Sequence, residues 1–173
     1  MVRCLVLFFD DGADTFRPLA QSVCNGSQKA GGETALISYS QWSKSGMSLD
    51  AFDLVFLEAD TTHLLHKNKA FEKFLEQNRW PGRNIALFCL CSSSRKSKDE
   101  FKAVCERMGA GGASVKNTLA LAVKGTLSFL GRGSLEEIDF VRAEAFGERT
   151  TNYFSGRRIS QPSEKARIAG YRK

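Results

Sequence analysis

Long apolar runs and histidine are both scarce in this sequence, and each scarcity excludes a kind of protein. No apolar stretch approaches the ~20 residues that a membrane-spanning helix needs, so no membrane association of that type is expected. The only histidines are His63 and His66. Their spacing could place them on one helix face, but the sequence assigns no third metal ligand beside them. We interpret both as surface residues without a metal.

Cysteine pairs of the CxxC type are also missing. The five cysteines are Cys4, Cys24, Cys89, Cys91 and Cys105. The spacing Cys89-Leu90-Cys91 is too tight for a zinc knuckle or a CxxC redox pair. Cys4, Cys89 and Cys91 fall in apolar runs, where cysteine behaves as a small hydrophobic residue. The pattern favours reduced thiols in the core of a cytoplasmic protein.

What the sequence contains is the composition of one ordinary globular domain. It has 173 residues, of which 42% are hydrophobic and 25% charged. The net charge of +6 is concentrated in residues 156–173, which hold six basic residues and one acid. We therefore expect a domain over residues 1–155 and a basic tail over residues 156–173. Tyr171 is the only aromatic residue after Phe154, whereas single-stranded nucleic-acid sites combine basic with aromatic side chains, so a nucleic-acid partner is not expected.

Short apolar runs alternate with amphipathic stretches, a pattern typical of βα repeats around a parallel sheet. The first apolar run ends in acids rather than in a signal-peptide cleavage site, which indicates a buried strand. The predicted strands cover residues 2–9, 34–39, 52–57, 85–91 and 118–123. The predicted helices begin near a cap at Asp14 or Thr15, at residue 67, at a cap at Asp99, and at a capping box of Ser134 and Glu137. In the last of these helices, the apolar stripe is expected to consist of Ile138, Val141, Ala145 and Phe146. Residues 40–50 are expected to form a polar connection and residues 92–98 a polar loop.

Several stretches resemble the flavodoxin family. Phe52-Asp53-Leu54-Val55 resembles its third strand, residues 69–75 (KAFEKFL) the following helix, and residues 81–88 (PGRNIALF) the turn into the fourth strand. Residues 124–133 (KGTLSFLGRG), followed by residues 136–139 and 145–147, are similar to the end of many flavodoxin-like chains. The resemblance implies a doubly wound, five-stranded parallel α/β sheet in the order 2-1-3-4-5. It also implies bound FMN that passes electrons to a redox partner protein.

The FMN site of such a fold lies at the carboxyl ends of the strands, where three loops of this chain are expected to meet. The residues that would contact FMN are Asp10, Asp11, Gly12, Ala13, Asp14 and Thr15 in the first loop, Thr61, Thr62 and His63 in the second, and Ser92, Ser93 and Ser94 in the third. This assignment requires Asp10, Glu58 and Cys91 to end neighbouring parallel strands.

The three loops differ in how well their chemistry suits a flavin. The family pattern in the first loop is Ser/Thr-x-Thr-Gly-x-Thr, and only Thr15 keeps its match. Three carboxylates would face the phosphate there, and two like charges ~4 Å apart cost about 1 kcal/mol in water and more when partly desolvated. The second loop has no Tyr or Trp to stack on the flavin, although His63 could lie alongside it. The small residues of the third loop would admit the polar edge of the ring.

Other functions were weighed against flavin binding. The acids Asp10, Asp11, Asp14, Glu58 and Asp60 could bind a divalent cation, but Asp is also a common turn and cap residue. A response-regulator receiver domain is disfavoured because Glu58 would replace its phosphoacceptor aspartate. No catalytic residue can be assigned. The leading hypothesis is an FMN-dependent electron-transfer or oxidoreductase protein, and the alternative is a flavodoxin-like scaffold without FMN that acts as a binding or regulatory module.

Overall fold

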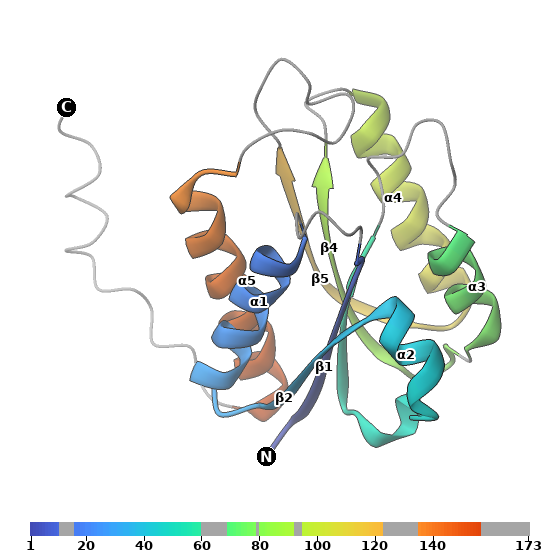
Figure 1. Cartoon of the computed structure of the whole chain (residues 1–173), viewed down its shortest axis with the longest axis horizontal. Coiled ribbons are helices and arrows are strands. Elements are labelled where there is room, and N and C mark those ends of the chain that lie inside the picture. Colours follow the sequence, from blue (N-terminus) through green and yellow to red (C-terminus); the bar gives the residue numbers. More distant parts are fainter. Residues whose placement is uncertain (11–15, 60–68, 79, 92–94, 123–134, 157–173) are drawn as a thin grey trace, which may run out of the picture.

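The computed structural model describes residues 1–10, 16–59, 69–78, 80–91, 95–122 and 135–156. Within these ranges the chain forms a central sheet with helices on both faces (Figure 1). No helix in this part of the chain is long and apolar enough to cross a bilayer.

Five parallel strands form the sheet, in the order β2-β1-β3-β4-β5. The strands are β1 (Arg3–Phe8), β2 (Glu33–Ser38), β3 (Leu54–Glu58), β4 (Asn84–Cys91) and β5 (Ser114–Ala122). Every residue of β3 is buried, as expected for a strand that is covered by helices on both faces. The predicted fold class and strand order are therefore confirmed.

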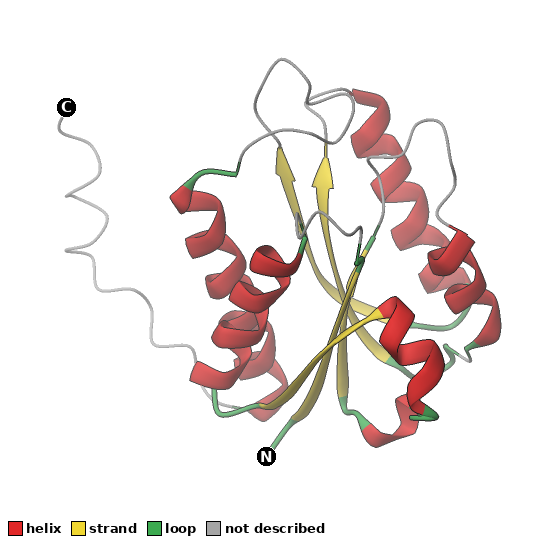
Figure 2. Cartoon of the chain, in the orientation of Figure 1, coloured by secondary structure: helices red, strands yellow, loops and turns green. Residues whose placement is uncertain are grey.

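The helices are divided between the two faces of the sheet (Figure 2). Helices α1 (Arg17–Lys29) and α5 (Glu137–Ser155) lie side by side on one face. Helices α2 (Tyr39–Ser45), α3 (Lys69–Gln77) and α4 (Arg95–Ala110) lie on the other. The short 3-10 helix η1 (Leu49–Ala51) precedes β3. This arrangement leaves the carboxyl ends of the strands at one end of the molecule.

Helices α1 and α5 meet at a contact that we call the α1–α5 seam, formed by Gly26, Ser27, Gly147 and Thr151. A β-carbon on Gly26 would lie 1.9 Å from the carbonyl oxygen of Glu144, and one on Gly147 would lie 2.1 Å from that of Val23. The Thr151 hydroxyl donates a 2.9 Å hydrogen bond to Oγ of Ser27, and both residues are fully buried. The two helices therefore approach to backbone contact, which only glycine permits at these positions.

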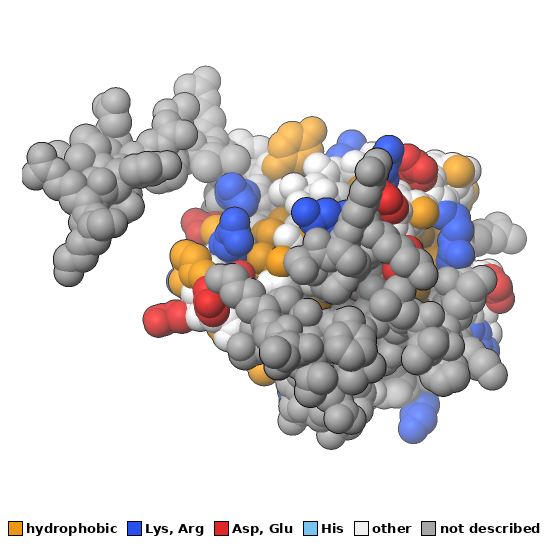
Figure 3. Space-filling view, turned by 90° about the horizontal axis from the view of Figure 1, so that it is seen from above, with side chains coloured by type: hydrophobic (Ala, Val, Ile, Leu, Met, Phe, Trp, Pro, Cys, Tyr) orange, Lys and Arg blue, Asp and Glu red, His pale blue; other side chains and the backbone are white. Residues whose placement is uncertain are grey.

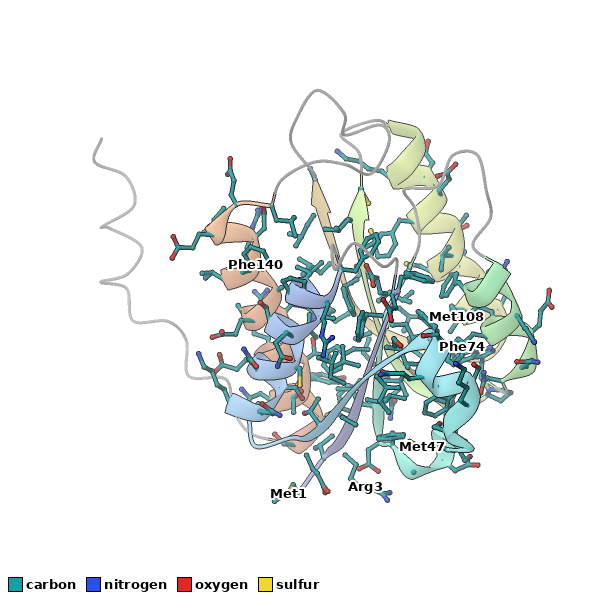
Figure 4. All side chains as sticks on the ribbon, in the orientation of Figure 1. Met1, Arg3, Met47, Phe74, Met108 and Phe140 are labelled. Carbon is teal, nitrogen blue, oxygen red and sulfur yellow. The ribbon has the colours of Figure 1, made fainter. Side chains whose placement is uncertain are left out.

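Aromatic side chains fill the layer under the opposite set of helices. The ring of Phe9 lies 4.7 Å from that of Tyr39 and 5.7 Å from that of Phe71, measured between centroids. Phe74 packs edge-on against Tyr39 at 5.0 Å. Figure 4 shows Phe74 and Met108 on the inner side of the helices that cover this face. Edge-to-face pairs at these distances contribute about 0.5–1.5 kcal/mol each beyond their buried area.

The polar connection predicted for residues 40–50 is wrong, because helix α2 and η1 occupy most of it. The Ser38 hydroxyl accepts a hydrogen bond from the N–H of Gln41, and the Gln41 side chain accepts one from the N–H of Ser38. This capping box fixes the first turn of α2, and burial of Tyr39 and Trp42 holds the helix against the fold.

Three predicted helix starts also differ from the structure. The N-cap of α1 is Phe16, so neither Asp14 nor Thr15 is the cap. Helix α4 begins at Arg95, before the predicted cap Asp99, and takes in part of the predicted loop. The capping box of α5 pairs Glu136 with Asp139, whereas the predicted partner Ser134 lies outside the described residues.

The predicted apolar stripe of α5 is only partly correct. Ile138 and Val141 were expected in the core, but they are 54% and 56% exposed. The buried face instead carries Phe146 together with small residues of the α1–α5 seam. The close approach of α1 selects small side chains at this contact, and large apolar side chains do not fit there.

Candidate functional site

Asp10, Glu58 and Cys91 stand at the ends of neighbouring parallel strands, as the sequence predicted. Asp10 is the second residue after the end of β1. Glu58 is the last residue of β3, and Cys91 is the last residue of β4. The strand order reverses between β1 and β3, since β2 lies outside β1 and β4 lies beyond β3. Ligands of open α/β sheets bind at such a reversal, so the candidate site lies at the ends of β1 and β3.

Glu58 joins the two strands that flank the reversal. Its side chain is fully buried, and its Oε2 accepts a 2.9 Å hydrogen bond from the backbone N–H of Phe9. The donor amide is the first one beyond β1, so the carboxyl group extends the link between β1 and β3 past the last paired residues. From its place in the sequence Glu58 was expected to be an acid available to a cation, whereas the structure buries it in a hydrogen bond with the backbone of Phe9.

Tyr39 fixes the same strand end from the other side. Its hydroxyl donates a 3.0 Å hydrogen bond to the backbone carbonyl of Glu58, and its ring packs against Phe9. The N–H of Ala59 donates to the carbonyl of Phe88 at 2.8 Å, which ties the end of β3 to β4. Side chains and backbone together tie the end of β3, the floor of the candidate site, to β1, α2 and β4.

The start of α1 borders this floor and favours negative charge. Its N-cap residue Phe16 has no side-chain acceptor, and its first turn contains Arg17 and no acid. The positive end of the helix dipole is therefore not neutralised by a residue of its own first turn. Arg17 and Asp10 line the same small hollow of about 50 Å³, which lies at the ends of β1 and β2 and is also lined by Leu36, Ser38 and Gln41. A cation thus lies close to the one acid of the first loop that the structure describes.

Of the residues predicted to contact FMN, the structure describes only Asp10, which is exposed. The others lie outside the described residues: Asp11, Gly12, Ala13, Asp14, Thr15, Thr61, Thr62, His63, Ser92, Ser93 and Ser94. The basic tail over residues 157–173 is outside them as well. The loop contacts therefore stay predictions, while the strand ends that carry the loops are in the expected places.

The structure describes only two of the five acids that the sequence offered as ligands of a cation. Asp10 and Glu58 are described, whereas Asp11, Asp14 and Asp60 are not. Among the described residues, no group of three or more His, Cys, Asp or Glu side chains is arranged to hold a metal ion.

Sequence reasoning missed three features of this region: the engagement of Glu58 with Phe9, the Tyr39 hydrogen bond, and the position of Arg17. Only Arg17 had a signal in the sequence, as a basic residue that precedes Pro18 at a helix start. The other two depend on strand register, which the sequence alone does not provide.

Two larger hollows lie elsewhere in the described structure. One of about 500 Å³ is at the amino ends of the strands and is lined by Met1, Val2, Asp53 and Asn84 among others. The other, of about 600 Å³, lies between α2 and α3 and is lined by Trp42 and Phe74 among others. Neither is at the strand reversal, so volume alone does not identify the candidate site.

Viewed from above, onto the carboxyl ends of the strands, the described surface carries interspersed charges (Figure 3). Basic, acidic and apolar side chains alternate there, and no single sign dominates the visible described area.

No protein-family model matches the chain, and no curated protein sequence matches it. Solved structures do match. The oxidised flavodoxin 1 of Bacillus cereus has a TM-score of 0.62 at 17% identity, over 84% of this chain and 94% of that protein. A flavodoxin from the domain Archaea has a TM-score of 0.62 at 13% identity, over 88% and 99%. A flavodoxin, WrbA-like protein from Agrobacterium tumefaciens has a TM-score of 0.61 at 16% identity, over 91% and 100%.

Proposed function

We propose that this chain, which has the flavodoxin fold, binds FMN at the ends of β1 and β3 and acts in electron transfer or a related redox reaction. In flavodoxins FMN lies at this strand reversal. The oxidised Bacillus cereus protein and a two-electron reduced flavodoxin of Megasphaera elsdenii are both among the similar structures. When bound, FMN would supply the redox chemistry, and the chain would hold and orient it.

The observation that carries this proposal is the chemistry at the start of α1. A phosphate dianion is stabilised by a helix N-terminus and by a guanidinium group. The first turn of α1 offers both, since it begins with Arg17 and contains no acid.

Phosphate recognition can be tested by comparing FMN with riboflavin, which lacks the phosphate. We expect the purified protein to quench the fluorescence of added FMN at a stoichiometry near one. Replacing Arg17 by Ala removes a charge-assisted contact of about 1.5–3 kcal/mol, so FMN affinity should fall about 10–150-fold. Riboflavin affinity should stay unchanged, because the contact is to the phosphate alone.

The matched control is Arg107→Ala, which removes an exposed arginine from the last turn of α4. It should leave the affinity for both flavins unchanged. If the Arg17 and Arg107 variants lost FMN affinity equally, the effect would be due to the overall charge of the protein. A colourless protein that quenches neither flavin would overturn the proposal.

The acids of the first loop favour a second candidate, a flavodoxin-like scaffold without flavin that serves as a binding or regulatory module. Asp10 is exposed at the end of β1, and Asp11 and Asp14 follow within four positions of it. Such a module would fail the flavin titration in every variant. A rise of the melting temperature with magnesium or calcium would then assign the acids to cation binding.

A further inference from the structure

Cys89 and Cys91 make a sulfur–sulfur contact that the flavin proposal does not use. Both thiols are buried near the carboxyl end of β4, and their Sγ atoms are 2.8 Å apart. Non-bonded carbon atoms pack at about 3.5–4.0 Å, and sulfur is larger than carbon. The two sulfurs are therefore closer than ordinary packing places them.

The position of the pair in the strand places the two thiols side by side. Residues two apart in a strand point to the same face, so both thiols face the layer of helices α3 and α4. Cys91 is the last residue of β4 and pairs with Ala122, the last residue of β5. The contact thus lies where the ladder ends, and strand ends open more readily than strand centres.

We propose that Cys89 and Cys91 form a thiol–disulfide exchange site that closes reversibly into an internal disulfide, with a small disulfide such as oxidised glutathione as the reactant. The thiolate of Cys91, at the strand end, attacks one sulfur of the small disulfide, which breaks its S–S bond. One reduced thiol leaves, and a mixed disulfide remains on Cys91. The thiolate of Cys89 then attacks Sγ of Cys91 and releases the second thiol.

The exchange is balanced. The two cysteine thiols lose two electrons and two protons, and the small disulfide takes them up as two thiols. No flavin takes part, so this inference stands apart from the proposed function. It also differs from a CxxC redox pair, because a single residue separates the two sulfurs.

Strand geometry predicts that the disulfide is easily reduced. At a rise of about 3.3 Å per residue, Cα atoms two apart in a strand are separated by about 6.6 Å. Disulfides usually span Cα distances of about 4.4–6.8 Å. The two Cβ atoms project in the same direction and are separated by about the same distance, whereas a disulfide spans about 3.5–4.5 Å between Cβ atoms. Closure must therefore distort the end of the strand, and this strain makes the bond labile, a property of regulatory disulfides and not of structural ones.

The other cysteines serve as internal controls. Burial raises the pKa of the Cys4, Cys24 and Cys105 thiols, which lowers their thiolate fraction. The sulfur of Cys4 contacts the Thr151 hydroxyl at 3.9 Å and the backbone carbonyl of Val2 at 3.8 Å. We expect selectivity for Cys89 and Cys91 from their proximity, because the second thiol lies 2.8 Å from the first and can resolve the mixed disulfide.

The test uses the purified full-length protein, equilibrated in mixtures that range from fully reduced to fully oxidised glutathione. After acid quenching, remaining thiols are alkylated and the protein is digested with trypsin. Cleavage after Arg83 and Arg95 gives one peptide that contains Cys89 and Cys91 and no other cysteine. In oxidising mixtures this peptide should lose two hydrogens and both alkylations, and dithiothreitol should restore them.

Replacing Cys89 by Ser should stop the second step, so that glutathione accumulates on Cys91. The control Cys105→Ser should leave the oxidation of the peptide unchanged. Two alkylated cysteines in the wild-type peptide at every ratio would overturn the proposal, as would a lasting glutathione adduct in place of the internal disulfide. Because the main readout needs only the wild-type protein, misfolding of a variant would not prevent the test.

Discussion

Replacing Gly26 by Ala tests whether the α1–α5 seam is in backbone contact. The new β-carbon would lie 1.9 Å from the carbonyl oxygen of Glu144, an atom of the helix backbone that cannot rotate away. Restoring a normal contact of about 3.5 Å would move the helices apart by roughly 1.5 Å. The 2.9 Å hydrogen bond from Thr151 to Ser27 would then break.

The expected cost follows from three contributions. Overpacking of a tight core contact costs about 1–3 kcal/mol, and loss of a buried hydrogen bond costs about 1 kcal/mol. The better helix propensity of Ala over Gly returns up to about 1 kcal/mol. The Gly26→Ala variant should therefore lose about 1–4 kcal/mol of unfolding free energy, or about 2–16 °C in melting temperature for a chain of this size.

Urea unfolding followed by circular dichroism measures this loss. The matched control is Gly109→Ala in α4, where an added β-carbon would meet no atom within 4 Å. That variant should gain about 0.5–1 kcal/mol. A Gly26→Ala variant within about 0.5 kcal/mol of the wild type, a change typical of neutral surface positions, would refute the backbone contact.

Two further predictions concern hydrogen bonds at opposite ends of the sheet. Tyr39→Phe removes the buried hydrogen bond to the carbonyl of Glu58 and should cost about 1 kcal/mol in urea unfolding, whereas Tyr153→Phe, at an exposed ring, should cost nothing measurable. Near the amino end of β1 (Figure 4), the N–H of Arg3 donates to Asp53, and this bond together with the Arg3 guanidinium lowers the pKa of Asp53. Because the pKa of Asp53 is lower in the folded than in the unfolded state, its ionised form stabilises the protein at pH values above the ordinary pKa of 3.8. This stabilisation is lost as the pH falls through the pKa of the folded state. The stability difference between wild type and Asp53→Asn should therefore narrow below about pH 3.8 in acid unfolding; a constant difference would contradict this.

The strands could be predicted because a buried parallel strand is apolar along its whole length. Strands β3 and β4 are almost continuous apolar runs, and the structure buries nearly all of their residues. Helix α2 was missed because it has seven residues and only two buried side chains, Tyr39 and Trp42. Its capping box was nevertheless readable as Ser38 followed by Gln41.

The buried face of α5 could not be predicted from hydrophobicity. A periodic pattern of large apolar residues assigned Ile138 and Val141 to the core, whereas the seam needs the smallest side chains. Gly147 allows the close contact because it has no side chain, and a hydropathy pattern does not reveal such a contribution.

The candidate site was predicted at the level of the backbone but not of the side chains. Parallel strands with short connections place Asp10, Glu58 and Cys91 at one end of the sheet whatever their side chains do. The burial of Glu58 depends on the register between β1 and β3, which brings its carboxyl group to the N–H of Phe9. Because an acid at a strand end is ordinarily exposed, the sequence suggested that Glu58 could bind a cation. In the structure its buried carboxyl group instead links β3 to the end of β1.

The α1–α5 seam has a consequence for synthesis on the ribosome. Ser27 and Thr151 are hydrogen-bonded across 124 positions of the chain, so α1 leaves the exit tunnel long before its partner helix is made. Until then its glycine-bearing face has no native neighbour, and contacts between such distant segments form slowly. We expect nascent chains that stop before α5 to stay sensitive to protease, and resistance to arise in one step once α5 has emerged.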